Sequence, residues 1–381
     1  MLSALFVNYN SWIVLRDALL SLRAAPPRLA DGSVMPHEVI VVDNASPLRN
    51  PPLEAEIRAL VAALGGEYIA HDENGGYSKG MNLALARSRG EHVLVCNPDI
   101  VLMPECLTRL VAHLDAHPEI GAVVPEAFWD RQLEAKMPDG ILPTPGESLA
   151  NVLAILCKPF ARAYTRRRTR RFVRLWTAPE SVELEEFAGC LLLMRRALID
   201  RIGFFDERFP LYFEDADLSL RVRKAGYKIV QLQSASFVHF YNRSGQTAHA
   251  LAMERYWTSR RLYLRKWWGA YGVAVDRLCR ALMRTRLYAR RSLRPPEAVV
   301  DLPIIADKPV LLLPRTLRRF VVQHAMDINF LLAVGAFGSG DRWSPGNELF
   351  ANYPAMIYLR VVDLDDPSGR AVGVWRFRRH A

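Results

Sequence analysis

The chain has 381 residues, of which 50% are hydrophobic and 24% charged, and its formal net charge at pH 7 is +10. This length and composition are those of a globular protein with a large core and room for more than one domain, and they exclude a disordered chain. The basic excess favours an acidic partner, and its distribution along the chain decides which kind.

Two polar turns follow the first two predicted strands. Residues 2–7 and 38–42 are apolar runs, and the stretch from Trp12 to Arg23 between them has apolar residues at helical spacing. Such a strand–helix–strand unit is right-handed by default and brings both strand ends to one edge of a sheet, where ligands bind in open α/β folds. The polar residues expected at this edge are Asn8, Asn10 and Asp43.

Asp43 has two interpretations that the residues alone leave open. Its carboxylate can accept a hydrogen bond from the imide N–H of uracil or thymine. It can equally form an Asx turn or a helix N-cap with the Asn44-Ala45-Ser46 segment that follows it.

A glycine pair follows the next strand-like run, residues 67–70. The segment Asn74-Gly75-Gly76-Tyr77 lets the backbone approach a ligand closely, and the helix predicted from Tyr77 to Arg89 offers free N–H groups to phosphate. The segment has neither a Walker ending nor the spaced third glycine of a dinucleotide fingerprint. A loop that only caps the helix is the alternative.

Asn97-Pro98-Asp99 closes the apolar run of residues 92–96, which is typical of a buried parallel strand. Pro98 ends the strand and leaves Asp99 at its carboxyl end. A carboxylate there can hold a divalent cation, which in turn can neutralise a diphosphate. Asn-Pro-Asp is also ordinary turn chemistry, so the tripeptide alone does not decide.

Three acids lie within four residues of each other far downstream. Glu214, Asp215 and Asp217 stand at the start of a helix predicted from Asp215 to Lys224. Acids there are stabilised by the helix dipole, and Asp217 is also spaced for a surface ion pair with Arg221. Crowded carboxylates raise one another's pKa, however, which suits a general base.

Taken together, these segments closely resemble the family 2 glycosyltransferases with a GT-A fold, and within them the bacterial rhamnosyltransferase-like branch. The resemblance covers about residues 1–245. It rests on these motifs: Val7-Asn8-Tyr9-Asn10, Val42-Asp43-Asn44-Ala45-Ser46, Asn74-Gly75-Gly76-Tyr77 with Asn82, Asn97-Pro98-Asp99, Gly189 before Arg195-Arg196, Phe205-Asp206-Glu207-Arg208-Phe209, Glu214-Asp215-Ala216-Asp217-Leu218, Gly226-Tyr227 and His239.

The resemblance implies a role for each matching position. Asp43 would bind the pyrimidine of a nucleotide-sugar, and Asp215 would be the catalytic base, with Glu214 orienting the acceptor. Asp99 and His239 would hold Mg²⁺ or Mn²⁺; Asn97 stands where the metal motif has its first acid, as is common in this branch. The remaining donor-binding residues implied are Asn8, Asn10, Asn74, Gly75, Gly76, Tyr77, Asn82 and Asn97.

An inverting reaction follows from one base on the face opposite the leaving group. Asp215 would take the proton of an acceptor hydroxyl while that oxygen attacks the anomeric carbon, and the cation would stabilise the departing diphosphate. A retaining double displacement needs a second carboxylate as nucleophile, and the sequence shows no separate candidate. The resemblance favours dTDP-rhamnose as donor and a glycan or polyprenyl-linked saccharide as acceptor.

We expect an α/β fold: a GT-A, Rossmann-like mixed sheet flanked by helices, followed by a basic helical segment and a small β-rich C-terminal domain. The expected boundaries are 1–250 for the catalytic domain, with an acceptor-side insertion at about 133–185, then 251–294 and 295–381. Strand-like runs at 310–313, 358–362 and 372–377 support the last domain. The segment 338–343 is expected to be a surface loop, with sugar binding as an alternative.

Two basic stretches account for much of the positive charge. One spans residues 162–174, and the other spans 255–294 and mixes arginines with tryptophans and tyrosines. This composition is typical of a peripheral anchor on an anionic membrane. A solvated helix that packs its aromatic face on the catalytic domain is the alternative, and no nucleic-acid-binding module accompanies the charge.

The remaining sequence features concern location and competing functions. Neither a spanning helix nor a signal peptide is expected, and five scattered cysteines indicate a reducing compartment, so we expect a cytoplasmic protein on the inner face of the cell membrane. A UDP-dependent galactosyl-, galactofuranosyl- or glucosyltransferase and a non-catalytic nucleotide-sugar-binding scaffold remain alternatives. A nucleotidyltransferase would need a Gly-rich basic loop after the first strand.

Overall fold

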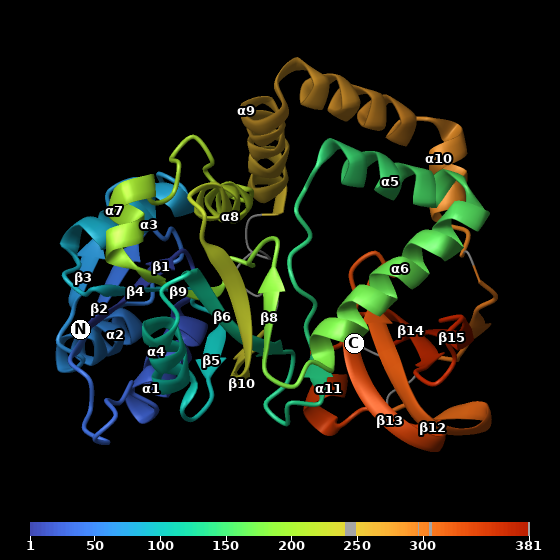
Figure 1. Ribbon diagram of the computed structural model, residues 1–381, viewed down its shortest axis with the longest axis horizontal. Helices are drawn as coiled ribbons and strands as arrows, with labels where there is room; N and C mark the ends of the chain where they lie inside the picture. The colour runs from blue at the N-terminus through green and yellow to red at the C-terminus, as the bar shows by residue number, and fades with distance from the viewer. Residues whose placement is uncertain (241–248, 296, 305–306, 380–381) are drawn as a thin grey trace. The chain divides into compact units, whose positions relative to one another are not determined.

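The computed structural model describes residues 1–240, 249–295, 297–304 and 307–379. The chain forms two compact units. The ranges of the first are 1–126, 139–142 and 179–267, and those of the second are 127–138, 143–178 and 268–381 (Figure 1).

The first unit is built on a mixed sheet whose central strands are parallel. Its strand order is β6-β9-β4-β1-β2-β3, and β10 pairs with β5, β6 and β8. The strands are β1 (Leu2–Asn8), β2 (His37–Asp43), β3 (Glu67–Ala70), β4 (His92–Cys96), β5 (Ile100–Leu102), β6 (Ile120–Phe128, whose last two residues belong to the second unit), β8 (Ser181–Leu184), β9 (Leu191–Arg195) and β10 (Lys228–His239).

Helices cover both faces of this sheet. In Figure 1, α1 (Trp12–Ala24) and α4 (Cys106–Ala116) lie on one side, while α3 (Tyr77–Arg87) and α7 (Arg196–Ile202) lie on the other. The other helices of the unit are α2 (Pro51–Ala63), α8 (Glu214–Lys224) and the first part of α9 (His249–Met283). Because β1 and β4 are buried along their whole length, their apolar runs need cover on both faces.

The parallel register brings the predicted polar turns to one edge. Asn8 at the end of β1 pairs with Asp43 at the end of β2, and Phe6 pairs with Cys96 at the end of β4. Asn97, which follows Cys96, therefore lies at the same edge as Asn8 and Asp43. Strand β10 runs antiparallel to β5 and places His239 opposite Ile100, the residue after Asp99.

The second unit combines a sheet with helices from two distant parts of the chain. The strand order is β11-β15-β14-β12-β13-β7. The strands are β7 (Ala135–Lys136), β11 (Val300–Asp301), β12 (Leu311–Ala325), β13 (Val334–Trp343), β14 (Met356–Asp363) and β15 (Ala371–Arg378). The helices are α5 (Pro145–Leu156), α6 (Lys158–Trp176), the second part of α9, α10 (Arg286–Ser292) and α11 (Asn347–Asn352).

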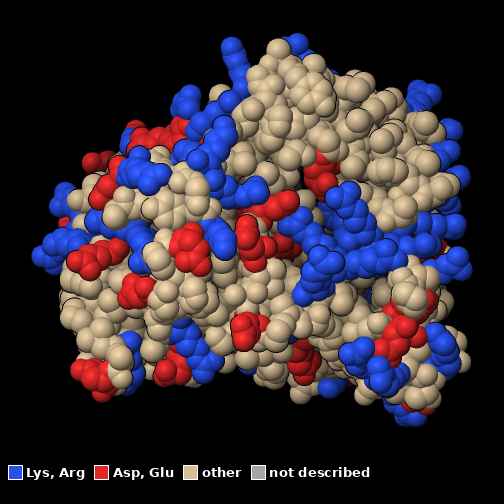
Figure 2. Space-filling view, in the orientation of Figure 1, with Lys and Arg blue, Asp and Glu red and all other residues tan. Residues whose placement is uncertain are grey.

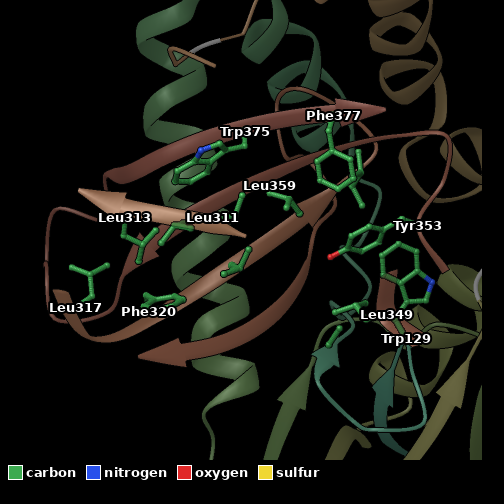
Figure 3. Close-up of a cluster of buried hydrophobic side chains, with 14 residues drawn as sticks. Trp129, Leu311, Leu313, Leu317, Phe320, Leu349, Tyr353, Leu359, Trp375 and Phe377 are labelled. Atoms are coloured by element: carbon green, nitrogen blue, oxygen red, sulfur yellow. The ribbon is translucent and has the colours of Figure 1, made fainter. Parts of the chain in front are cut away.

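Aromatic and aliphatic side chains from the insertion and from the C-terminal segment form the core of the second unit. Trp129, near the start of the insertion, packs with Phe320, Tyr353 and Phe377 of the C-terminal segment (Figure 3). Helix α6 packs closely on β13, where Trp176 lies against Gly335. Only glycine allows this approach, because a Cβ at Gly335 would stand 2.3 Å from the Trp176 ring. The insertion therefore packs with the C-terminal strands.

The predicted fold class is confirmed: a mixed α/β sheet with flanking helices precedes a helical segment and a β-rich C-terminal region. The segment 338–343, expected to be a surface loop, is instead the end of β13, where it pairs with β12. Its glycines interrupt the alternation of apolar and polar residues by which a strand is predicted. Helix α9 is kinked at Gly269, which has φ of 57°. Among the described residues, no helix is long and apolar enough to cross a membrane.

Candidate active site

Asn8, Asp43 and Ser46 form a buried hydrogen-bond network at the ends of β1 and β2. Asn8 Nδ2 donates to Asp43 Oδ1 at 2.8 Å, and the Ser46 hydroxyl donates to the same oxygen at 2.5 Å. Ser46 N also donates to Asp43 Oδ2 at 3.3 Å, three residues along the chain, so the Asp43 side chain closes the turn that follows β2. Oδ1 is thus occupied within the protein, while Oδ2, which also lies 3.8 Å from Arg49 Nη1, keeps acceptor capacity for a ligand.

The loop after β1 is fixed against the loop after β2. Asn10 has a left-handed backbone with φ of 56°, and its side-chain Oδ1 accepts from Leu48 N at 2.9 Å. Ser46 also accepts from Asn10 N at 2.9 Å. The predicted donor-binding residue Asn10 therefore shapes the rim around Asp43 through its backbone and its amide.

The segment 74–77 is held in place by an asparagine that the sequence reasoning did not single out. Asn44 Nδ2 donates to Asn74 Oδ1 and to the Gly76 carbonyl, both at 3.1 Å, and Asn44 Oδ1 accepts from Gly75 N at 3.2 Å. Gly76 has φ of 90°, and a Cβ there would stand 2.6 Å from the Pro210 carbonyl oxygen. Both the conformation and the close approach require glycine.

Tyr77 links this segment to the turn after β4 and to Gly189. Its hydroxyl lies 3.2 Å from both Asn97 Oδ1 and the Gly189 carbonyl, either of which can accept its proton. Burial raises the pKa of Tyr77 well above its usual value. Tyr77 is therefore a neutral donor that joins three of the motifs at one place.

Asn82 makes contacts within the protein rather than toward the strand ends. Its Oδ1 accepts from Phe205 N at 3.2 Å, and its Nδ2 donates to the Phe205 carbonyl and to Glu207 Oε1, both at 2.9 Å. These bonds fix α3 to the segment that leads into α8. A donor contact by Asn82 stays a prediction, and the structure gives the residue a structural role.

Asp99 and His239 meet because β5 and β10 are paired. His239 Nε2 lies 3.4 Å from Asp99 Oδ1, and both side chains are largely buried. Burial alone would lower the pKa of His239, but the neighbouring Cys190 thiol and Asp99 outweigh it and raise that pKa to about 10. Cys190 is a second residue that the sequence reasoning missed, because nothing near Gly189 signals metal-ligand spacing.

The residues present fit a cation that is bound only in part by protein. Asp99 and His239 supply one oxygen and one nitrogen ligand, and a cation would take the place of the proton between them. Within the described parts of the chain, no group of three or more His, Cys, Asp and Glu side chains is arranged to hold a metal ion. Mg²⁺ and Mn²⁺ prefer six ligands, so ligand oxygens from outside the protein would have to complete the shell.

Glu214 and Asp215 form a crowded acid pair at the N-terminus of α8. Asp215 Oδ1 accepts from Ala216 N at 2.8 Å, and Oδ2 accepts from Gly189 N at 3.3 Å. Glu214 is buried, and its Oε2 has no hydrogen-bond partner among the described residues. Burial raises the pKa of both carboxyls, and the charge of Asp215 raises that of Glu214 further. Glu214 therefore keeps its proton more firmly than Asp215 does.

Asp217 forms the predicted pair with Arg221 at 2.9 Å, but in the protein interior rather than on the surface. Asp217 also accepts from Lys266 Nζ at 2.6 Å and from Trp267 Nε1 at 2.9 Å. Three donors therefore compensate one buried carboxylate. The third acid of the motif attaches the first part of α9 to α8.

A third contact unpredicted from the sequence comes from α9. Arg255 donates to Asn74 Oδ1 at 3.2 Å and lies 3.4 Å from its carbonyl oxygen. An acid pair near these polar strand ends could accept a proton from a hydroxyl, and a cation held between Asp99 and His239 would stabilise a departing diphosphate.

Comparisons with known proteins agree with this chemistry. Residues 3–174 match the sequence family described as glycosyl transferase family 2. An N-acetylglucosaminyl-diphospho-decaprenol L-rhamnosyltransferase of Mycobacterium tuberculosis is 26% identical over 254 residues, which cover 61% of this chain and 74% of that protein. The O-antigen biosynthesis protein RfbC of Myxococcus xanthus is 27% identical over 197 residues, covering 50% of this chain and 14% of that protein.

A solved structure shows the likeness in fold. GalNAc-T7 with UDP, GalNAc and Mn²⁺ superposes with a TM-score of 0.51 at 15% identity, covering 76% of this chain and 52% of that chain. Together with the sheet described above, this likeness confirms the expected GT-A fold. The chain is therefore a glycosyltransferase whose residues 3–174 match glycosyl transferase family 2.

Proposed function

We propose that this protein is an inverting, metal-dependent glycosyltransferase that moves a sugar from a nucleotide-sugar to a hydroxyl of a glycan or lipid-linked saccharide. The sugar proposed is rhamnose from dTDP-rhamnose, used in cell-surface polysaccharide synthesis. The observation that carries this proposal is the acid pair Glu214–Asp215, which stands beside Gly189 in the same unit as the Asp99–His239 pair.

Asp215 serves as the base in this proposal. Its side chain is partly exposed while Glu214 is buried, so an acceptor hydroxyl can reach Asp215 first. The raised pKa of Asp215 makes it a better proton acceptor than an ordinary aspartate. Glu214, which holds its proton more firmly, would donate a hydrogen bond through the otherwise unpaired side of its carboxyl and so orient the acceptor.

Asp99 and His239 would hold Mg²⁺ or Mn²⁺ with oxygens of the nucleotide diphosphate. The cation would neutralise the negative charge that grows on the departing diphosphate. Asn97 precedes Asp99 by two residues and donates its N–H to the Cys190 carbonyl at 2.8 Å, while the Tyr77 hydroxyl lies 3.2 Å from Asn97 Oδ1. They would position the donor at the cation.

Asp43 would bind the pyrimidine base through Oδ2, the oxygen with free acceptor capacity. Thymine and uracil present the same imide N–H to this oxygen, so geometry alone does not separate dTDP from UDP donors. The name of the mycobacterial relative supplies the choice of rhamnose, and it also supplies a polyprenyl-diphosphate-linked saccharide as the class of acceptor.

A lipid-linked acceptor would place the protein at the cytoplasmic face of the cell membrane. The basic stretches at 162–174 and 255–294 would attract anionic lipids there, and the aromatic residues of 255–294 would add contacts that salt does not screen. This part of the proposal is independent of the transfer chemistry.

Thermal stabilisation by a panel of nucleotide-sugars with Mn²⁺ tests the proposed donor. We expect the largest rise in melting temperature with dTDP-rhamnose, a smaller rise with UDP-sugars and none with GDP-mannose, because guanine carries its N1–H on a two-ring base, farther from the ribose than the N3–H of a pyrimidine. Asp43→Asn should abolish the preference for pyrimidine donors. A larger shift with a purine nucleotide-sugar would contradict the donor assignment.

A further inference from the structure

Residues 270–294, here called the 270–294 surface, comprise the second part of α9, helix α10 and the turn between them, all in the second unit. We propose that this surface is the one that docks on an anionic membrane, rather than the arginine-rich helix α6. The inference rests on the proposed membrane association and assigns it to particular residues.

The second part of α9 exposes an apolar stripe. The exposed residues at helical spacing are Tyr271, Ala274, Leu278 and Ala281. Tyr271 is 63% exposed and Leu278 51% exposed. Residues on the other face, such as Gly272 and Cys279, are buried. A surface helix normally turns its only apolar stripe to the core. This helix has a further apolar stripe on its outer side, which no other described part of the second unit covers.

Helix α10 is exposed more completely. None of its residues is buried. Leu287 is 54% exposed, and Leu293 just beyond the helix is 79% exposed. A seven-residue helix that buries no side chain gains little from folding alone, since most helical stability in proteins comes from packing. Its exposed leucines therefore point to an external apolar phase.

The charge of this surface selects an anionic partner. Residues 270–294 contain one acid, Asp276, which is buried and pairs with Arg280 at 3.0 Å. The exposed cations are Arg277, Arg284, Arg286, Arg290, Arg291 and Arg294. In Figure 2, blue side chains lie at the margin of the tan area over α5, α9 and α10. A second copy of the chain would bring the same arginines together and repel.

Helix α6 differs in where its apolar residues lie, since arginines of both segments also bond within the unit: Arg291 of the 270–294 surface donates to the Leu156 carbonyl at 2.7 Å. Arg168 pairs with Glu147 at 2.6 Å, and Arg170 donates to the Pro367 carbonyl at 2.7 Å. Its apolar residues, including Phe172 and Trp176, are buried in the second unit. Helix α6 thus offers charge without an exposed apolar stripe. Arginines around exposed leucines are the pattern of an interfacial helix, in which charge attracts the protein and apolar side chains enter the acyl boundary.

The test is vesicle flotation of the full chain, using phosphatidylglycerol mixed with phosphatidylcholine and phosphatidylcholine alone. Leu278→Ser/Leu287→Ser/Leu293→Ser should weaken binding to the anionic vesicles by about tenfold or more, and the remaining binding should disappear at high salt. Arg284→Glu/Arg286→Glu/Arg290→Glu should remove binding at low salt. All variants should keep the wild-type melting temperature, because these side chains are exposed.

The matched control is Arg162→Glu/Arg167→Glu/Arg174→Glu, which makes the same charge change at three exposed positions of α6. It should retain most of the binding. Loss of binding in this control, with wild-type binding in the leucine variant, would overturn the assignment while leaving membrane association intact. Absence of wild-type binding at low salt would overturn both, and transfer to a soluble acceptor would still test the catalytic proposal. Tighter binding to a DNA duplex than to anionic vesicles would also overturn the inference.

Discussion

Trp267 Nε1 donates to Asp217 Oδ1 at 2.9 Å, and this bond joins residues 50 positions apart in the chain. Asp217 is completely buried, and Arg221 and Lys266 are its other donors. The arrangement fixes the first part of α9 on α8 two residues from the proposed base. Asp217 therefore fixes the start of α8, the helix that carries Asp215.

Removing one donor from this cluster should destabilise the protein strongly. Arg221→Met should lower the free energy of unfolding by about 3–5 kcal/mol, because it leaves a buried charge with part of its compensation gone. Arg221 also donates to the Gly203 carbonyl at 2.6 Å at the end of α7, and that bond is lost too. Urea denaturation followed by tryptophan fluorescence measures the change.

Arg223→Met is the matched control, because Arg223 is an exposed arginine on the same helix. Its effect should stay within about 0.5 kcal/mol, the usual range for surface substitutions. Equal stability of the two variants would show that the Asp217 cluster does not bear on the fold.

The sequence was sufficient to predict the strand ends that build the site. Runs of apolar residues that stop at Asn8, Asp43 and Asn97 identify buried parallel strands, and parallel strands share the edge at which they end. The start of α8 and the strand before His239 were predictable for the same reason, since local periodicity and turn residues mark them.

Contacts between distant segments could not be predicted from local pattern. The pair Asp217–Arg221 has ordinary surface spacing. It becomes a buried cluster only because α9 packs on α8 and brings Lys266 and Trp267 to Asp217. Cys190 meets His239 through strand pairing, and Asn44 reaches Asn74 across a loop. The packing of the insertion on the C-terminal strands depends on Trp176 against Gly335, whose contact is set by tertiary structure.

Glu214 should make stability depend on pH. Its pKa in the folded protein is raised above the usual 4.5, mainly by burial and then by Asp215. Between pH 4.5 and the raised pKa of the folded protein, the unfolded chain has released the proton of Glu214 while the folded chain retains it. The free energy of unfolding therefore falls as pH rises through this range. Glu214→Gln removes the contribution of Glu214 to this dependence, and its melting temperature should gain on the wild type as the pH rises above 4.5.

Thermal melts of both proteins at a series of pH values provide the check, with Glu183→Gln at an exposed position as the control. Parallel curves for the wild type and Glu214→Gln would mean that Glu214 is already ionised in the fold.

Metal binding should depend on nucleotide. Since Asp99 and His239 supply two protein ligands, Mn²⁺ alone should bind weakly, and nucleoside diphosphate should strengthen its binding by completing the shell. Asp99→Ala should remove the mutual enhancement while leaving the metal-free affinity for nucleotide largely unchanged. Isothermal titration calorimetry with each ligand alone and with both distinguishes these cases. Equal Mn²⁺ affinity with and without nucleotide, or full activity in excess chelator, would refute the assignment.

The central claim is that Asp215 removes a proton from the acceptor hydroxyl during sugar transfer. Release of nucleoside diphosphate from the donor, measured with and without acceptor for the wild type and for Asp215→Asn, tests it most directly. Asp215→Asn should transfer sugar about 10²–10⁴-fold more slowly while binding the nucleotide-sugar as the wild type does. Transfer at the wild-type rate by Asp215→Asn would contradict the account.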